Sequence, residues 1–249
     1  MKLLKILSLI ITLLTISNCK NDSNSGESTK LQIAFKEDSS KFTMPQKQLI
    51  REVIFNSEKE VRTLLPELPD SIKVVVEVVD WDIESVGGVT GRTASNIPPL
   101  VEIQVSYRFP GGIANAVKTA LKDVVFHEFH HLYRGWAIQD NKFEQGIAIA
   151  AVNEGLAVVF SEVYTNLILE ANSPPKDSIA DSWVKEIMEL PKDADYQKWM
   201  FQHPDGRTSI GYRSGNYLVR KALSNSGIDI LELSELTPNE ILSLSGYLD

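Results

Sequence analysis

The stretch IANAVKTALKDVVFHEFHHLYR, from Ile113 to Arg134, has the spacing of apolar residues that is typical of a long helix. Its apolar side chains form a stripe along one face, and that stripe continues to His127 and His131. Gly135 follows directly and predicts the end of the helix, because glycine readily adopts the left-handed conformation that closes a helix. We therefore expect a long helix whose buried face presents two histidines near its C-terminal end.

Three of the four histidines lie in the sequence His127-Glu128-Phe129-His130-His131, which matches the pattern H-E-x-x-H. Residues four apart lie one turn apart on a helix, so two imidazoles at this spacing can bind one zinc ion at ~2.0–2.1 Å. Glu128 is next to the first ligand and can reach a water on the metal. His130 shares a face with His127, but we prefer His131 because the pattern uses a spacing of four. The alternative is a histidine-rich surface turn that matches by accident.

A second helix is predicted over residues 146–170, and Glu154 is the one charged residue in its apolar run from Ile147 to Phe160. A buried carboxylate costs several kcal/mol, order of magnitude, unless it is paired or bound to a metal. We therefore expect Glu154 to be the third metal ligand. A buried salt bridge to Arg134 is the alternative. Two other carboxylates are the next candidates for the third ligand: Glu144 and Glu162.

The rest of the pattern predicts an α+β fold, with a small N-terminal sheet followed by a mainly helical half. The alternation at residues 101–106 predicts a half-exposed strand at a sheet edge, and Gly91 is predicted to lie in a loop with Gly87 and Gly88. The other predicted elements are a strand at 72–79 and helices at 46–65, 181–190, 209–223 and 238–244.

The composition excludes several classes of protein. With 43% hydrophobic residues the chain can bury a core, and its 11 prolines and 14 glycines are too few for a fibrous protein. The net charge is −8 and no run of Lys or Arg forms a basic patch, which argues against nucleic-acid binding. A single cysteine excludes a disulfide within the chain.

The first 18 residues have the pattern of an export signal. Lys2 and Lys5 precede an apolar run at 6–16 that is too short to span a bilayer comfortably. Removal of this segment would make the net charge more negative by two.

Cys19 directly follows this segment, and its position resembles a bacterial lipobox. We expect a lipid on Cys19 that anchors the exported protein to a bacterial membrane; an ordinary secretory signal with an incidental cysteine is the alternative. Residues 19–30 are rich in Ser, Asn and Asp and predict a flexible tether, which leaves residues 31–249 as the folded domain.

The motifs together resemble the gluzincin peptidases, which carry H-E-x-x-H on one helix and N-E-x-x-A on the next. More closely, the chain resembles a bacterial family of predicted zinc-dependent proteases in which an H-E-(Y/F)-H-H motif is followed by E-G-L-A and G-Y-x-x-G. Here these motifs are His127–His131, Glu154–Ala157 and Gly211–Gly215, in the same order. The resemblance extends from about Gly87 to Arg220.

This resemblance implies a zincin-like fold, in which the active-site helix packs on a mixed sheet and the zinc is held by His127, His131 and Glu154. The edge strand of such a fold lies beside the cleft and can pair with an extended peptide, and residues 101–106 are the natural candidate. Gluzincins often carry a carboxylate four residues after the glutamate ligand, where it orients a histidine. Val158 occupies that position here, so we expect Glu162 or Ser161 to substitute.

Tyr212, in the third motif, is the first candidate for a hydrogen-bond donor to the oxyanion, and His203 is the second. A core aromatic is the alternative for Tyr212, and a solvated loop histidine is the alternative for His203. The four tryptophans are expected in the core or at the rim of the site.

We therefore expect an exported, lipid-anchored zinc peptidase in which Glu128 takes a proton from the attacking water and passes it to the leaving amine. Its partner would be a peptide or protein substrate; endopeptidase, aminopeptidase and amidase activity all fit this prediction. The alternative is a surface lipoprotein that binds a partner and keeps a structural or vestigial metal site. Glu128 favours the enzyme, because a binding module needs the metal ligands but not the base.

Overall fold

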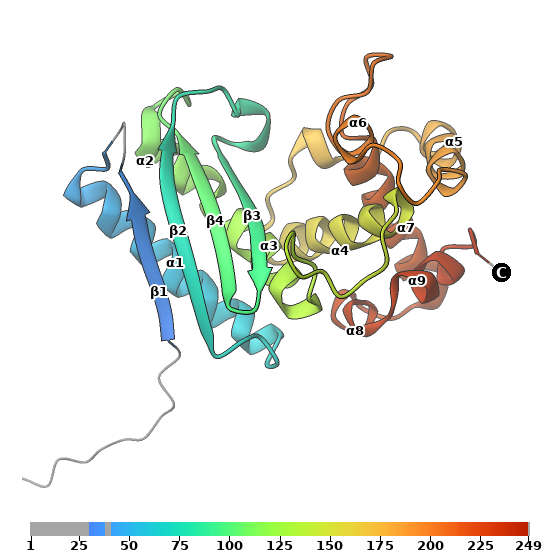
Figure 1. Ribbon diagram of the computed structural model, residues 1–249, viewed down its shortest axis with the longest axis horizontal. Coiled ribbons are helices and arrows are strands. Elements are labelled where there is room, and N and C mark those ends of the chain that lie inside the picture. Colours follow the sequence, from blue (N-terminus) through green and yellow to red (C-terminus); the bar gives the residue numbers. More distant parts are fainter. Residues whose placement is uncertain (1–29, 38–40, 249) are drawn as a thin grey trace, which may run out of the picture.

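The computed structural model describes residues 30–37 and 41–248 of the chain (Figure 1). The predicted export signal and Cys19 lie outside the described residues. Of the predicted tether at 19–30, the structure describes Lys30, which begins the first strand.

A four-stranded mixed sheet forms the N-terminal half, with the strand order β1-β2-β4-β3. Strands β1 (Lys30–Lys36), β2 (Ser71–Val79) and β4 (Pro99–Ser106) are parallel, and β3 (Val89–Asn96) is antiparallel to β4. The strands predicted at 72–79 and 101–106 are therefore confirmed, whereas β1 and β3 are not predicted from the sequence.

Two expectations about this sheet are wrong. Strand β4 is internal and β3 is an edge strand, and Gly91 lies within β3 rather than in a loop. The alternation in β4 arises from the two faces of the sheet: Val101 is buried against the helices, while Glu102 is half-buried on the other face beside Arg92 of β3. Alternation of apolar and polar residues along a strand indicates which face of the sheet is exposed to solvent. It does not indicate whether the strand is internal or at the edge of the sheet.

One face of the sheet is covered by α1 (Met44–Leu64) and by the helix that carries the histidines (Figure 1). The latter is a continuous helical run of α2 (Gly112–Ala116), a π-helical turn η2 (Val117–Leu121) and α3 (Lys122–Arg134). Gly135 ends it with a φ of 78°, and its N–H donates to the last carbonyls of α3. The predicted helix over 113–134 and its glycine stop are therefore confirmed.

The C-terminal half is mainly helical, as predicted. Its α-helices are α4 (Ile147–Thr165), α5 (Asp177–Met188), α6 (Tyr196–Met200), α7 (Ile210–Ser226), α8 (Ile230–Glu235) and α9 (Pro238–Leu244). Two short 3₁₀ turns, η1 (Glu84–Val86) and η3 (Glu170–Asn172), complete the described elements. Helix α4 ends before Asn166, which has a φ of 59°, so it is shorter than the predicted 146–170. Helices α6 and α8 are not predicted from the sequence.

Helix α4 lies in the interior of the protein. It is long and apolar enough to cross a membrane, yet 78% of that window is buried inside the structure, which is typical of a core helix. It packs against α3 on one side and α7 on the other, and one hydrophobic core extends from the sheet to the C-terminal helices. This position brings α4 alongside the helix that carries the two histidines.

Candidate metal centre

His127, His131 and Glu154 converge on one point between α3 and α4. The two Nε2 atoms lie 3.0 Å apart, and they lie 3.2 Å and 3.1 Å from Oε2 of Glu154. Three ligands bound tetrahedrally to zinc at ~2.0–2.1 Å would lie ~3.3 Å from one another. The nitrogen–oxygen donor set and its spacing therefore fit a zinc ion.

Two of the three residues in this cluster are buried, and His127 is half-buried. Glu154 is 5% exposed and His131 is 3% exposed. Burial raises the pKa of Glu154, but the neighbouring His131 and His127 outweigh it and lower that pKa overall. A buried carboxylate that stays ionised needs a positive partner, and a metal cation between the two imidazoles would supply one.

The other candidate ligands have other partners. His130 is fully buried and its Nε2 lies 2.9 Å from Oγ of Ser234. Arg134 donates to Asn153 and to the carbonyls of Ser234 and Leu236, so the alternative salt bridge to Glu154 is not among its described contacts. The other two candidate carboxylates form ion pairs with basic side chains away from the histidines: Glu144 pairs with Lys192, and Glu162 pairs with Arg220.

Glu128 lies beside this cluster, under the edge strand β3. The hydroxyl of Thr93 lies 3.0 Å from Oε2 of Glu128 and 2.9 Å from its backbone carbonyl, and can donate to either. Burial, with a contribution from Glu154, raises the pKa of Glu128 to about 7, although His127 and Thr93 act in the opposite direction. A carboxyl group with such a pKa can both accept and release a proton near neutral pH.

Gly91 is the reason that Glu128 fits under β3. A Cβ atom at position 91 would lie 2.7 Å from Cγ and 2.9 Å from Oε1 of Glu128. The glycine at position 91 predicted a loop from the sequence. In the structure it instead allows strand β3 to approach the side chain of Glu128 closely. Thr93, which the sequence did not single out, is two residues further along the same strand.

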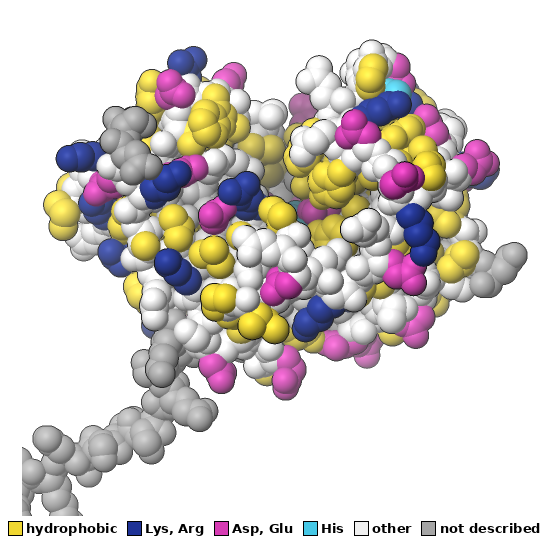
Figure 2. All heavy atoms as spheres, in the orientation of Figure 1, with side chains coloured by type: hydrophobic (Ala, Val, Ile, Leu, Met, Phe, Trp, Pro, Cys, Tyr) yellow, Lys and Arg dark blue, Asp and Glu magenta, His cyan; other side chains and the backbone are white. Residues whose placement is uncertain are grey.

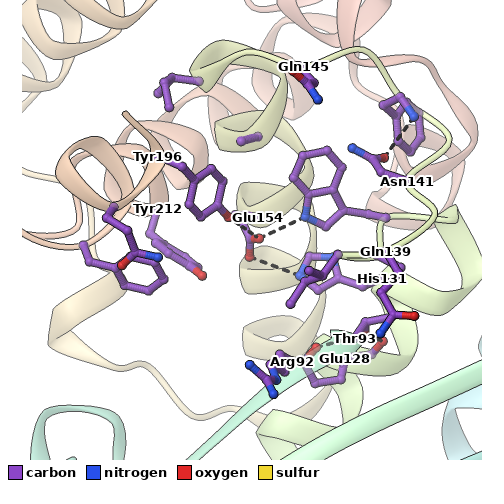
Figure 3. A pocket seen from close by; sticks show the side chains of 18 of the residues that line it. Arg92, Thr93, Glu128, His131, Gln139, Asn141, Gln145, Glu154, Tyr196 and Tyr212 are labelled. Atoms are coloured by element: carbon purple, nitrogen blue, oxygen red, sulfur yellow. Dashed lines mark hydrogen bonds and ion pairs between the residues drawn. The ribbon is translucent and has the colours of Figure 1, made fainter. Parts of the chain in front are cut away.

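Two tyrosines, Tyr196 and Tyr212, lie across the pocket from His131, and both face Glu154 (Figure 3). The hydroxyl of Tyr196 lies 3.4 Å from Oε1 of Glu154. Burial, together with Glu154 and Glu128, raises the pKa of Tyr212 well above its usual value, so its hydroxyl keeps its proton. Tyr212 is expected here from the sequence. Tyr196 is not, because α6 is too short to give a periodic signal, although Asp195 caps its start.

Trp136 contacts the metal centre directly. Its indole N–H donates to Oε1 of Glu154 over 3.0 Å. A position at the rim agrees with the expectation for the tryptophans, but the hydrogen bond to Glu154 is not predicted.

Three other predicted residues do not reach the histidine pair through any described hydrogen bond. Ser161 donates to the carbonyl of Val158 within α4, and Glu162 is bound by Arg220 and Asn216. His203 pairs with Asp205 at 2.8 Å, and its ring packs on Trp199. His203 is not among the residues that line the cleft.

The cluster opens into a cleft of about 1000 Å³. The surface is hollowed between the sheet and the C-terminal helices (Figure 2). Besides residues of α3 and α4, the lining of the cleft comes from the edge strand at 90–93, Glu102 and Gln104 of β4, the loop at 136–147, the segment 192–201 and Tyr212. The amides of Ile138 and Gln139 donate to the carbonyls of Thr93 and Ala94, so the loop covers the second half of the β3 edge. The open part of that edge is Thr90–Arg92.

The fold is a mixed sheet packed on a helix that carries two histidines, and the next helix supplies a glutamate beside them. The three side chains form a group that could hold a metal ion, as in a metalloprotein. Residues 112–243 match the family described as Predicted Zn-dependent protease (DUF2268), which covers just over half of the chain, and the chain belongs to this family. This confirms the resemblance to a family of predicted zinc-dependent proteases, whereas the resemblance to gluzincins stays a prediction. No curated protein and no solved structure matches the chain.

Proposed function

We propose that the protein is a zinc-dependent peptidase whose metal ligands are His127, His131 and Glu154. The observation that carries the proposal is the convergence of two imidazole nitrogens and one carboxylate oxygen, within 3.2 Å of one another, with Glu128 beside this group but outside it. The family description supports the same chemistry. Zinc bound there would polarise a scissile carbonyl and lower the pKa of a water to ~7.

Glu128 is the proposed general base. Its carboxylate takes a proton from the attacking water and delivers it to the nitrogen of the leaving group. A hydrogen bond from Thr93 orients this side chain, and the absence of a Cβ atom at Gly91 leaves the space that it occupies. Tyr212 is the proposed donor to the oxyanion, because its hydroxyl stays protonated and lies in the same cleft.

The substrate is proposed to be an extended peptide that pairs with the open edge of β3. Backbone groups of Thr90–Arg92 border the cleft beside Glu128, and an unpaired edge strand can add one more strand. The sequence pointed to residues 101–106 for this role, but those residues form the internal strand β4.

The test is a comparison of wild type with Glu128→Gln, measuring zinc content and cleavage of casein and of a peptide library. We expect about one zinc per chain in both proteins, and a rate that falls by ~10²–10⁴ in the variant, which is the usual contribution of a general base. Cleavage that is undiminished in Glu128→Gln would overturn the mechanism. Zinc in both proteins with no cleavage by wild type would support the alternative, a binding module with a vestigial metal site.

We also propose that the enzyme is exported and anchored to a bacterial membrane through a lipid on Cys19. The support is the sequence alone: a short apolar run at 6–16 follows Lys2 and Lys5, and the only cysteine of the chain comes three residues after this run. Cys19→Ala should move the protein from the membrane fraction to the soluble fraction. Retention of this variant in the membrane fraction would contradict the lipid anchor.

A further inference from the structure

The carboxylate of Glu154 has two oxygens with different partners. Oε2 faces Nε2 of both histidines, at 3.2 Å and 3.1 Å. Oε1 accepts a hydrogen bond of 3.0 Å from the indole N–H of Trp136 and lies 3.4 Å from the hydroxyl of Tyr196. The two oxygens are therefore not equivalent, and one of them points away from the point where the ligand atoms converge.

Trp136 lies just after the helix that carries the histidines and is hydrogen-bonded to its last turn. It follows Gly135, and its backbone N–H donates to the carbonyl of His131 over 2.9 Å. Its ring packs against Phe143, with the ring centroids 6.2 Å apart. These two contacts fix the position of the indole N–H relative to His131. The indole N–H in turn donates to Glu154, which lies on the neighbouring helix α4.

An indole is suited to this task because its N–H can donate but cannot accept or bind a metal. A glutamate side chain that rotates freely loses entropy when it binds, and a hydrogen bond made before binding removes part of that cost. Groups that orient metal ligands commonly change metal affinity by ~10–100-fold.

Among the described contacts, no hydrogen bond orients either histidine through its Nδ1 atom, although the buried carboxylate of Asp123, one turn before His127, interacts with His127 electrostatically. Val158 occupies the position where a carboxylate would orient a histidine, and Nδ1 of His131 is buried with no hydrogen-bond partner. Neither Glu162 nor Ser161, the substitutes that the sequence suggested, has a described hydrogen bond to either histidine. The hydrogen bond from Trp136 restrains Glu154 instead.

We propose that Trp136 is a positioning residue of the metal centre, whose indole N–H holds Oε1 of Glu154 so that only Oε2 faces the histidine pair. This inference rests on the proposed metal centre and adds a residue to it.

The test measures metal affinity and does not depend on activity. Zinc dissociation constants are determined on the full chain by competition with a chromophoric chelator, and the visible spectrum of the cobalt-loaded protein is recorded at saturation. Trp136→Phe removes the N–H and keeps an aromatic ring, and Trp136→Leu is a second variant. Trp183→Phe is the matched control, since Trp183 packs against Arg207 and Arg213 and does not line the cleft.

We expect Trp136→Phe to weaken zinc binding by ~10–100-fold and to alter the cobalt spectrum, while Trp183→Phe changes neither. In a Glu154→Ala background, Trp136→Phe should have no further effect on affinity, because its action passes through that carboxylate. An unchanged affinity and spectrum in Trp136→Phe, or an equal loss in both backgrounds, would overturn the positioning role. A wild-type protein that binds neither metal would instead overturn the metal centre itself.

Discussion

Gly155 of α4 and Gly215 of α7 touch backbone to backbone where the two helices cross. A Cβ atom on Gly155 would overlap the backbone of Gly215, and a Cβ atom on Gly215 would overlap the carbonyl oxygen of Ala151. Glu154 directly precedes the first glycine, and Tyr212 lies one turn before the second. The glycines of the E-G-L-A and G-Y-x-x-G motifs therefore set the distance between a proposed metal ligand and a proposed oxyanion donor.

Gly215→Ala should separate these helices and destabilise the protein. A methyl group forced into a closely packed interior costs ~1–3 kcal/mol, and more where the obstacle is backbone that cannot move aside. The free energy of unfolding of the metal-free protein, measured in urea, should fall by at least this amount. Ser224→Ala, at an exposed position of the same helix, should change it by less than ~0.5 kcal/mol. Equal stabilities of the two variants would show that the crossing can relax.

Gly91→Ala should impair catalysis more than it impairs metal binding. The added Cβ atom would lie 2.7 Å from Cγ of Glu128 and 2.8 Å from Cγ1 of Val124, so the proposed base must move, and neither of these residues is a proposed metal ligand. A displacement of about 1 Å commonly costs ~10²-fold in rate. We expect kcat to fall by about that factor with zinc content unchanged. A variant with full activity would mean that Glu128 does not act from this position.

Much of the metal centre was predictable because its signals are local. The spacing of His127 and His131 follows from helix geometry, and Glu154 is conspicuous as a charge in an apolar helix. The end of α3 at Gly135 and the bounds of α9 follow from strong local stop and start residues.

The residues that support the centre were not predictable, because they depend on tertiary contacts. Strand β3, with the sequence VTGRTASN, has few apolar residues and an internal glycine, so its composition resembles a loop. Only the fold reveals that Gly91 and Thr93 of this strand contact Glu128, or that Trp136 reaches Glu154. The sequence thus indicates the candidate metal ligands and the candidate base, but not the residues that contact and position them.

Tyr212→Phe should lower kcat while leaving zinc content and KM nearly unchanged. Loss of one donor to an oxyanion typically costs ~10²–10³-fold in kcat, because the hydrogen bond is made in the transition state. Tyr196→Phe provides the comparison, since its hydroxyl faces Oε1 of Glu154 at 3.4 Å and should matter less for the rate. Steady-state kinetics on both variants check this. A large loss in Tyr196→Phe with none in Tyr212→Phe would assign the oxyanion to Tyr196.

Glu128→Gln should stabilise the metal-free protein at high pH but not at low pH. Burial raises the pKa of Glu128 from 4.5 to about 7, so the folded state holds its proton more tightly than the unfolded state does. The stability that this provides is complete below pH 4.5 and is lost as the pH rises through 7, by an amount on the order of 3 kcal/mol. A neutral glutamine escapes that loss.

Unfolding of both metal-free proteins in urea at pH 5 and pH 8 measures this difference. The stabilities of wild type and Glu128→Gln should be similar at pH 5, where the carboxyl group is largely protonated in the folded protein. At pH 8 the variant should be more stable by up to about 3 kcal/mol, because wild type must bury an ionised carboxylate next to Glu154. His127 and Glu154 enter this difference through their interactions with the Glu128 carboxylate, and their other contributions are common to both proteins. A difference that is the same at both pH values would mean that the pKa of Glu128 is not raised in the folded protein.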